Sequence, residues 1–206
     1  MPKRINHGYP IYVAPNMLGV YRNGDPSVYD ELNKTHLNPQ NINDKILIYE
    51  RQVKEWFIKP AELLLETLGE AGSAFIILSV CLSYLEGIQQ YIEGKSSTQK
   101  SKDFFIKSFQ RVYATAGLDE KAVRDVYDEA RCGLFHDGMT RSRIVYNLNQ
   151  DVSFRKTDDG WQEMYEFRPR LCLEGMKADF NSFIKELQDH NNITRRYRFG
   201  GLYDIT

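Results

Sequence analysis

Residues 119–140 read DEKAVRDVYDEARCGLFHDGMT, and this pattern predicts an amphipathic helix with a charged and titratable end. Asp119 can cap the first turn, because its carboxylate accepts hydrogen bonds from backbone N–H groups that lack partners inside the helix. Apolar side chains recur along one side at positions Ala122, Val123, Val126, Tyr127, Ala130 and Leu134. Asp137 and Gly138 predict where the helix ends.

Arg131 and His136 lie near that end and are the first candidates for chemistry. A guanidinium is always charged and binds two phosphate oxygens at once, whereas an imidazole titrates near neutral pH. On an ideal α-helix, positions five apart are separated by about 140° and about 7.5 Å. The pair can therefore share one phosphate only if the helix ends or bends at Gly133, or if two copies of the chain bring their pairs together around a two-fold axis.

A structural interpretation of the same two residues stays open. Arg131 can form a salt bridge with Asp128 or Glu86, and His136 can bind the last helix carbonyls as a favourable cation at the negative end of the dipole. Arginine followed by histidine at such a spacing also occurs by chance, so the spacing alone does not decide between the interpretations.

The order Arg-Cys-Gly-Leu-Phe-His-Asp-Gly at residues 131–138, at the end of a predicted helix, resembles the HEPN superfamily. These are all-helical domains whose ribonuclease members carry Arg, a variable run and then His. The resemblance is most specific over residues 130–140 and looser over the predicted helices within 44–190. Active members often have a polar residue, typically Asn, after the arginine, and this chain has Cys132 there.

The resemblance implies a homodimer that cleaves single-stranded RNA without a metal or another cofactor. His136 would exchange protons with the ribose 2′-hydroxyl or the leaving 5′-oxygen, and Arg131 would hold the phosphate. Among supporting residues, Glu86 would hold the Arg131 guanidinium and Asp137 could orient His136. Cys132 fits a small buried side chain better than a nucleophile, because no second histidine is placed to activate it.

A non-catalytic HEPN-like dimer that binds RNA, a nucleotide or a protein partner is the alternative. Cys132, the net charge of −1 and an inserted hairpin favour this alternative. A purely structural dimer is a third hypothesis. For the nuclease we expect a role in defence, toxin–antitoxin pairing or stress response, with a protein antitoxin or regulator as a possible partner.

The composition is that of an ordinary globular protein, with 42% hydrophobic and 27% charged residues in a chain of 206. A net charge of −1 excludes a globally basic nucleic-acid binder, so any RNA contact must come from a local patch. Cys81, Cys132 and Cys172 are odd in number and widely spaced, which favours reduced thiols in the cytoplasm. The longest apolar run, residues 74–85, is too short to span a membrane.

The whole chain predicts a mainly α fold, an up-and-down HEPN-like bundle of four to five helices with a small β-hairpin insertion before the last helix. We expect an irregular N-terminal arm at residues 1–43, a helical domain at 44–190 and a C-terminal tail at 191–206. The expected helices cover residues 44–68, 70–93, 101–116, 119–137 and 171–190, and the insertion, a hairpin or three-stranded flap, covers 142–168.

Three local features qualify that prediction. Pro60 should kink or split its helix, because proline lacks the backbone donor and clashes with the preceding turn. Residues 158–160, Asp-Asp-Gly, predict a tight turn in the insertion. The tail combines arginines with aromatic residues and could bind a nucleic acid strand, but an extended end packed on protein is the commoner use of such a segment.

Overall fold

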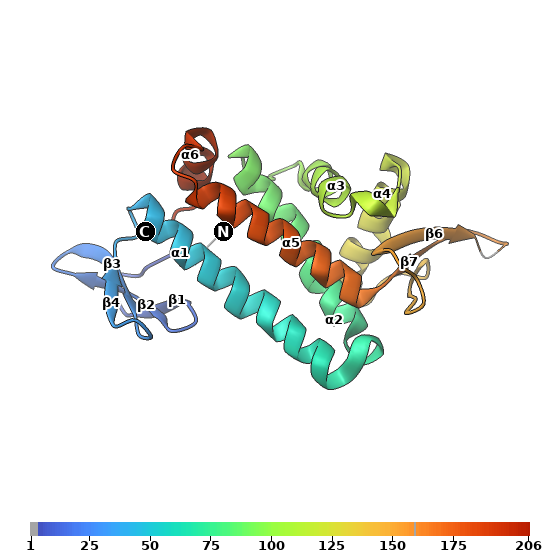
Figure 1. Cartoon of the computed structure of the whole chain (residues 1–206), viewed down its shortest axis with the longest axis horizontal. Coiled ribbons are helices and arrows are strands. Elements are labelled where there is room, and N and C mark those ends of the chain that lie inside the picture. The colour runs from blue at the N-terminus through green and yellow to red at the C-terminus, as the bar shows by residue number, and fades with distance from the viewer. Residues whose placement is uncertain (1–3, 159) are drawn as a thin grey trace. The chain divides into compact units, whose positions relative to one another are not determined.

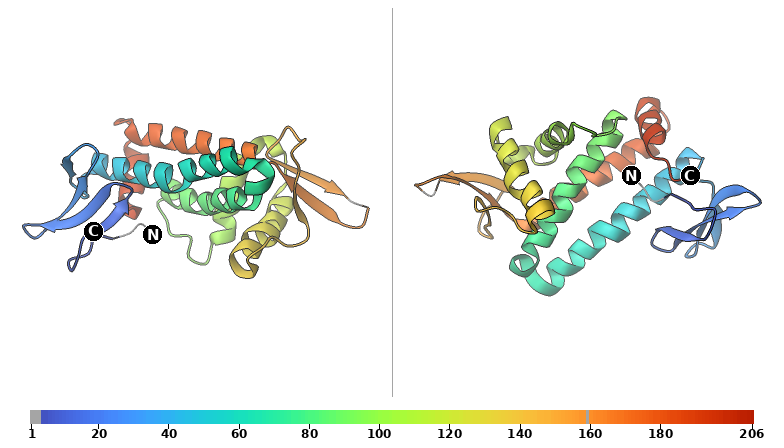
Figure 2. Two further views of the ribbon diagram at one scale, coloured as in Figure 1. Left: turned by 90° about the horizontal axis from the view of Figure 1, so that it is seen from below. Right: turned by 180° about the vertical axis from the view of Figure 1, so that it is seen from behind.

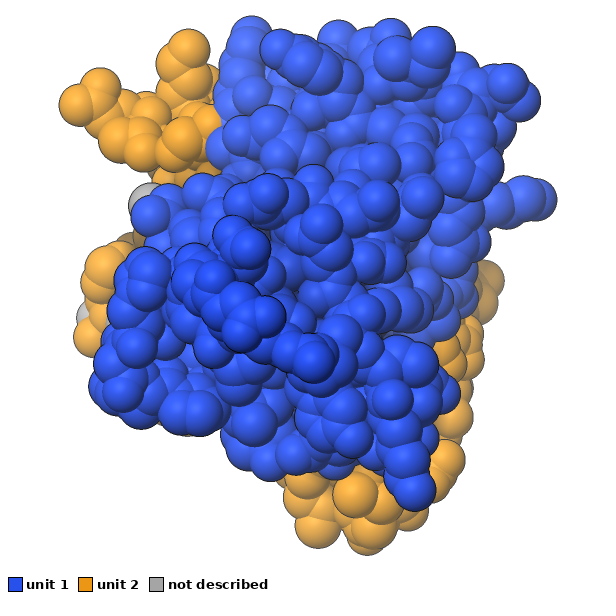
Figure 3. All heavy atoms as spheres, turned by 90° about the vertical axis from the view of Figure 1, so that its left-hand side faces the viewer, with its two compact units in different colours: residues 1–60, 91–95, 181–206 blue, residues 61–90, 96–180 orange. Residues whose placement is uncertain are grey.

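The structure, a computed structural model, describes residues 4–158 and 160–206, apart from the side chains of Phe135 and Asp137. The chain divides into two compact units, drawn in different colours in Figure 3. Unit 1 contains the described residues up to 60 together with 91–95 and 181–206, and unit 2 contains 61–90 and 96–180. Two long helices, α2 (Lys59–Glu93) and α5 (Pro169–Gln188), contribute residues to both units.

Unit 1 begins with a four-stranded antiparallel sheet in which consecutive strands pair, β1-β2-β3-β4. The strands are β1 (Ile11–Ala14), β2 (Met17–Arg22), β3 (Asp25–Asp30) and β4 (Thr35–Leu37) (Figure 1). Val13, Met17 and Val28, one from each of the first three strands, are buried. The predicted irregular arm was therefore wrong: strands of three to six residues are too short to show a sustained period, and signals such as Asn23-Gly24 mark hairpin turns between them.

The first helices of the chain follow one another closely. Helix α1 (Ile42–Val53) continues into a π-helical turn, η1 (Lys54–Ile58), and then into α2. Pro60 follows this wide turn, in which the Lys59 N–H bonds to the Lys54 carbonyl. The wide turn makes room for the proline ring, so the helix is not split there. Helical geometry is instead interrupted at Gly69, whose φ of 69° and ψ of 174° are outside the helical range.

The core of unit 1 is a cluster of aromatic rings from α1, α2, α5 and the C-terminal segment. Its members are Tyr49, Tyr91, Phe183, Phe199 and Tyr203, with neighbouring ring centres 5.0–6.5 Å apart. The C-terminal segment was expected to be extended, but it forms helix α6 (Ile193–Leu202), capped by Asn192. Helical spacing places Phe199 and Tyr203 together in this core, which explains the helix.

Unit 2 contains residues 61–90 of α2, the first part of α5 and the helices between them. These are α3 (Ser101–Val112), the 3₁₀ turn η2 (Ala114–Ala116), α4 (Glu120–Val126) and the π-helical turns η3 (Tyr127–Arg131) and η4 (Gly133–Asp137). Its core holds Ile77, Leu78, Cys81, Leu82, Leu85, Phe105, Phe109, Val123, Phe154, Phe167 and Phe180. The helices expected over these ranges are confirmed, with shifts at their ends.

The insertion in unit 2 is a three-stranded mixed sheet in the order β5-β7-β6. Strands β6 (Phe154–Asp158) and β7 (Glu163–Phe167) form the expected antiparallel hairpin, while β5 (Ile144–Tyr146) pairs parallel to β7. Gly160 has a φ of 88°, as a turn requires, and Asp159 lies outside the described residues. Figure 2 shows the helix that begins with α4 beside this sheet.

The predicted fold class was wrong. Helix makes up 56% of the structure and two sheets accompany it, which does not fit a mainly α bundle with one hairpin. The N-terminal sheet escaped prediction because its strands are short and partly exposed. The division into domains at residues 44 and 190 stays a prediction.

One apolar window in the helical run Ile42–Glu93 has the length and hydropathy of a membrane span, and half of it is buried inside the protein. Buried core helices have the same properties. The expected absence of a membrane segment and the cytoplasmic location stay predictions.

Candidate functional site

The helix that carries Arg131 and His136 begins and ends where its sequence predicts. The Asp119 carboxylate accepts a hydrogen bond from the Ala122 N–H at 2.7 Å, as an N-cap does. Gly138 ends the helix with a φ of 74°. The course of the helix between these points was not predicted, because η3 and η4 are π-helical turns on either side of Cys132.

The π-helical turns change the angle between the two candidate residues. In such turns the N–H of residue i+5 bonds to the carbonyl of residue i, as Cys132 bonds to Tyr127. Residues five apart therefore lie nearer to one line along the helix than the about 140° of an α-helix allows. Arg131 and His136 are five apart and span both turns, so their side chains project toward more similar directions.

Glu86, on α2, holds the Arg131 guanidinium. Arg131 Nη2 lies 3.1 Å from Glu86 Oε2, and the two side chains are 24% and 16% exposed. The other carboxylate oxygen accepts a hydrogen bond from the Ser97 hydroxyl at 3.0 Å. The Arg131 guanidinium also lies 5.6 Å from the centre of the Tyr127 ring. The expected contact is present, but both the catalytic and the structural interpretation predicted it.

The remaining predicted residues, His136, Cys132 and Asp137, follow Arg131 in the sequence and differ in their exposure. His136 is exposed, and within the described part of the chain no hydrogen bond or ion pair involves its ring. Cys132 is a free, partly buried thiol. The backbone of Asp137 belongs to η4, but its side chain lies outside the described residues. Neither Arg131 nor His136 is sealed in the interior.

Gly133 allows the chain beyond the helix to fold back against it. A Cβ at this position would lie 2.6 Å from the Met139 carbonyl oxygen and 3.0 Å from the Arg141 nitrogen. That nitrogen donates to the Glu129 carbonyl at 2.9 Å. Any larger side chain at Gly133 would push residues 139–141 away from the helix segment that carries the candidate pair.

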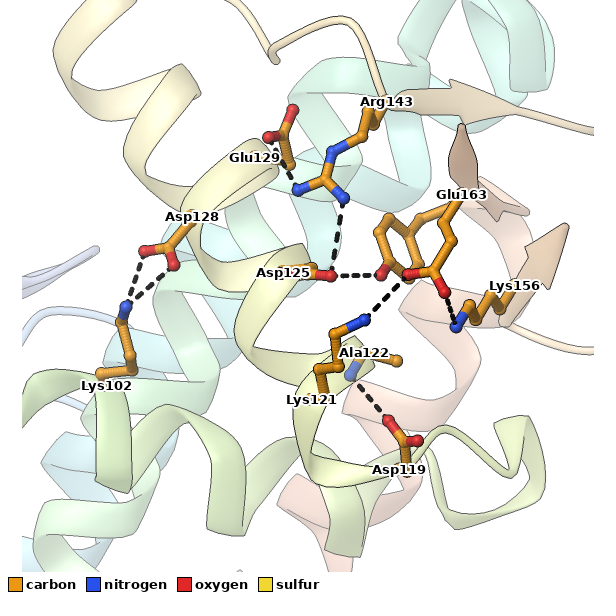
Figure 4. Close-up of polar contacts among 11 residues, drawn as sticks. Lys102, Asp119, Lys121, Ala122, Asp125, Asp128, Glu129, Arg143, Lys156 and Glu163 are labelled. Atoms are coloured by element: carbon orange, nitrogen blue, oxygen red, sulfur yellow. Dashed lines mark hydrogen bonds and ion pairs between the residues drawn. The ribbon is translucent and has the colours of Figure 1, made fainter. Parts of the chain in front are cut away.

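A second set of polar residues, which we call the Arg143 cluster, joins this helix to the sheet β5-β7-β6 (Figure 4). It consists of Arg143, Asp125, Glu129 and Tyr165. Arg143 contacts Glu129 at 3.0 Å and Asp125 at 3.5 Å, and the Tyr165 hydroxyl donates to Asp125 at 2.6 Å. Burial and the bond to Asp125 raise the pKa of Tyr165. Burial alone would lower the pKa of Arg143, but the Glu129 hydrogen bond raises it overall.

Lys102, on α3, also contacts this helix and was not predicted as part of the site. Its ammonium group lies 2.8 Å from Asp128 Oδ1 and 5.4 Å from the centre of the Tyr127 ring. In the sequence it is one of several cations on its helix, with Lys107 and Arg111. Only the contact with Tyr127, which also contacts Arg131, distinguishes it, and no sequence pattern shows that contact.

The arginines of the C-terminal segment have structural partners. Arg195 donates to the Ile92 carbonyl at 3.2 Å, near the end of α2, and to Glu186 at 2.8 Å. Arg196 donates to the Leu187 carbonyl, near the end of α5, and to Asn43 at 2.7 Å. Cations at helix C-termini satisfy carbonyls that have no partner inside the helix. These contacts support packing on the protein as the use of this segment, rather than RNA binding.

A pocket of about 300 Å³ lies in unit 1 and contains none of the predicted site residues. It is lined by Asn43, Ile46, Leu47, Glu50, Gln188, His190 and Arg196. Among the residues that the structure describes, no group of three or more His, Cys, Asp or Glu side chains could hold a metal ion.

No protein-family model, curated protein or solved structure matches this chain. The candidate site therefore depends on the chemistry and geometry of its own residues and on the HEPN resemblance of residues 130–140.

Proposed function

We propose that the protein is a metal-independent endoribonuclease that cleaves single-stranded RNA at a site formed by Arg131 and His136 in a homodimer. One observation supports this proposal most. A partly exposed guanidinium, held by Glu86, and an exposed imidazole lie five positions apart across two π-helical turns that bring them toward one side of the helix.

The reaction would be a transesterification within the RNA. The ribose 2′-oxygen attacks the adjacent phosphorus and loses its proton, while the bond from phosphorus to the 5′-oxygen breaks and that oxygen gains a proton. The products are a 2′,3′-cyclic phosphate and a free 5′-hydroxyl. His136 would accept the first proton or supply the second, and water would exchange the remaining proton, a task that suits an imidazole.

Arg131 would bind the phosphate and neutralise the charge that develops on its oxygens. Glu86 would fix the guanidinium before RNA binds, because the ion pair and the Tyr127 ring already restrict its position. The requirement for a 2′-hydroxyl makes DNA of the same sequence a non-substrate.

Cleavage of single-stranded RNA in the presence of EDTA tests this function. Wild-type protein should produce fragments with cyclic phosphate ends, whereas Arg131→Ala and His136→Ala variants of equal thermal stability should be inactive. Lys185→Ala serves as the control, because this lysine is exposed on α5 and is not one of the candidate site residues. Cutting that survives both substitutions would refute the assignment.

The dimer can be tested by mixing the two inactive variants. A shared cleft in the Arg131→Ala/His136→Ala heterodimer retains one functional arginine and one functional histidine. We expect the mixture, after subunit exchange, to recover part of the activity that each variant lacks alone. Two sites that work independently within single chains would show no recovery.

A non-catalytic RNA-binding or protein-binding module is the second candidate, and Cys132 favours it because a polar residue is typical at this position in active HEPN nucleases. This alternative predicts that the wild type binds RNA or a protein regulator in EDTA without cutting RNA. For either candidate, a cytoplasmic protein paired with an antitoxin or another regulator is the biological setting that we propose.

A further inference from the structure

We propose that Lys102 forms a second phosphate contact beside the Arg131 site, so that the RNA backbone contacts both of the cations that lie over the Tyr127 ring. This inference depends on the proposed function, because it takes RNA as the ligand. It adds a residue from a different helix, α3, to which the HEPN resemblance gives no role.

The geometry connects the two cations through one aromatic ring. The Lys102 ammonium lies 5.4 Å and the Arg131 guanidinium 5.6 Å from the centre of Tyr127, so the two charges are at most about 11 Å apart. A short stretch of single-stranded RNA can contact both, since nucleic-acid-binding grooves follow the backbone with successive cations.

The ring itself is held in place. Tyr127 is 8% exposed and packs edge-on against Phe105, with ring centres 5.1 Å apart. Burial raises the pKa of Tyr127, so its ring stays neutral at physiological pH. The two cations are therefore placed by a fixed neutral group on the π-helical turn η3 that packs against helix α3.

The present partner of Lys102 is one that a phosphate can replace. The Lys102 and Asp128 side chains are 38% and 43% exposed. Exposed ion pairs of this kind contribute about 0–1 kcal/mol, because water and salt screen them. An RNA phosphate that approaches Tyr127 therefore competes with Asp128 for Lys102 at little cost in folding stability.

Equilibrium binding tests the contact directly. The ligand is a fluorescently labelled single-stranded RNA of 12 nucleotides, and the protein is the full-length His136→Ala variant, which cannot cut it. At low salt, Lys102→Met should weaken binding several-fold, and Lys102→Arg should restore it. The slope of log K against log salt should fall by about 0.7 in Lys102→Met, because one fewer phosphate is neutralised.

Two further variants distinguish a ligand contact from a structural one. Asp128→Asn should tighten binding, because it removes the competitor of the phosphate, whereas a structural role for the pair predicts no gain. Lys107→Met is the matched control: Lys107 is exposed on the same helix and also lies over an aromatic ring, 5.8 Å from the centre of Phe104, but not over Tyr127. Its binding should equal that of the parent.

Cleavage kinetics separate failure of this inference from failure of the nuclease proposal. In the otherwise wild-type protein, Lys102→Met should raise KM and leave kcat unchanged. If the wild type cuts RNA but Lys102→Met behaves like Lys107→Met in KM, affinity and salt slope, Lys102 is not a phosphate contact and the nuclease proposal stands. If the wild type neither binds nor cuts RNA, both proposals fail.

Discussion

The two sides of the helix formed by α4 and η3 use charge differently (Figure 4). On one side Asp128 contacts Lys102 in a single pair with both side chains more than a third exposed. On the other side Arg143 is shared by Asp125 and Glu129, and Tyr165 donates to Asp125. Asp128 and Glu129 are adjacent in the sequence, so neighbouring acidic residues serve opposite sides.

The difference shows when an ion pair contributes to folding stability. Arg143 has two carboxylate partners and a tyrosine ring 5.7 Å from its guanidinium, and all of these side chains are largely buried. Removing one partner would leave other groups unpaired away from water, which is costly. Lys102 is open to water, so its partner can change at little cost. The side with the Arg143 cluster therefore stabilises the fold, and the side with Lys102 is available to a ligand.

Gly133→Ala should lower the free energy of unfolding more than any other substitution considered below. The added methyl group would overlap the Met139 carbonyl and displace the Arg141 N–H from Glu129, so we expect a loss of about 3 kcal/mol in the free energy of unfolding. Urea denaturation measures this loss. Gly87→Ala is the matched control, because a Cβ there meets no atom within 4 Å and should stabilise the helix by up to about 1 kcal/mol. Equal effects at both glycines would contradict the fold-back of residues 139–141.

Arg143→Met should have the next largest effect, a loss of about 2 kcal/mol, because Asp125 and Glu129 would keep their charges without the cation between them. Thermal unfolding and urea denaturation at pH 7 measure it. Lys121→Met is the comparison, since its pair with Glu163 is at the surface and at 3.4 Å. If both substitutions cost the same, the Arg143 cluster contributes no more than a surface ion pair.

Tyr165→Phe should cost about 1 kcal/mol at pH 7, the value of one hydrogen bond. The pKa of Tyr165 is raised in the folded protein, so its contribution is fully present below the unfolded pKa of about 10 and is lost as pH rises toward the folded pKa. The stability difference between wild type and variant should therefore shrink above about pH 10. A difference that stays constant from pH 7 to 11 would show that the hydroxyl does not bond to Asp125.

Lys102→Met should change stability least, by no more than about 0.5 kcal/mol, because its pair with Asp128 is exposed. The same denaturation series measures this effect. A loss comparable to that of Arg143→Met would erase the contrast between the two sides and would assign Lys102 a structural role.

Sequence patterns predicted the long helices, because a hydrophobic period is visible once an element exceeds about ten residues. The N-cap at Asp119 and the stop at Gly138 followed from local chemistry that needs no tertiary information. The strands β1–β4 could not be predicted from such patterns. Each is at most six residues long, and its partner strands are recognisable only after the turns between them are known.

The candidate site was predictable only in part. Arg131 and His136 could be chosen because their residue types suit phosphate chemistry, and Glu86 because a carboxylate can hold a guanidinium. Lys102 could not be chosen, since its distance from Arg131 depends on how α3 packs against Tyr127. The π-helical turns were also invisible, because no residue type in 127–137 requires them.

The two wide turns around Cys132 make the arrangement of the pair depend on the type of helix. A π-helical turn fits one more residue into a turn than an α-helix does. Straightening both turns into ordinary α-helix, with no residue removed, would return Arg131 and His136 to a separation of about 140° around the helix axis. The imidazole would then point away from the guanidinium even though every side chain involved is still present, so in this segment the width of the turns matters as much as residue identity.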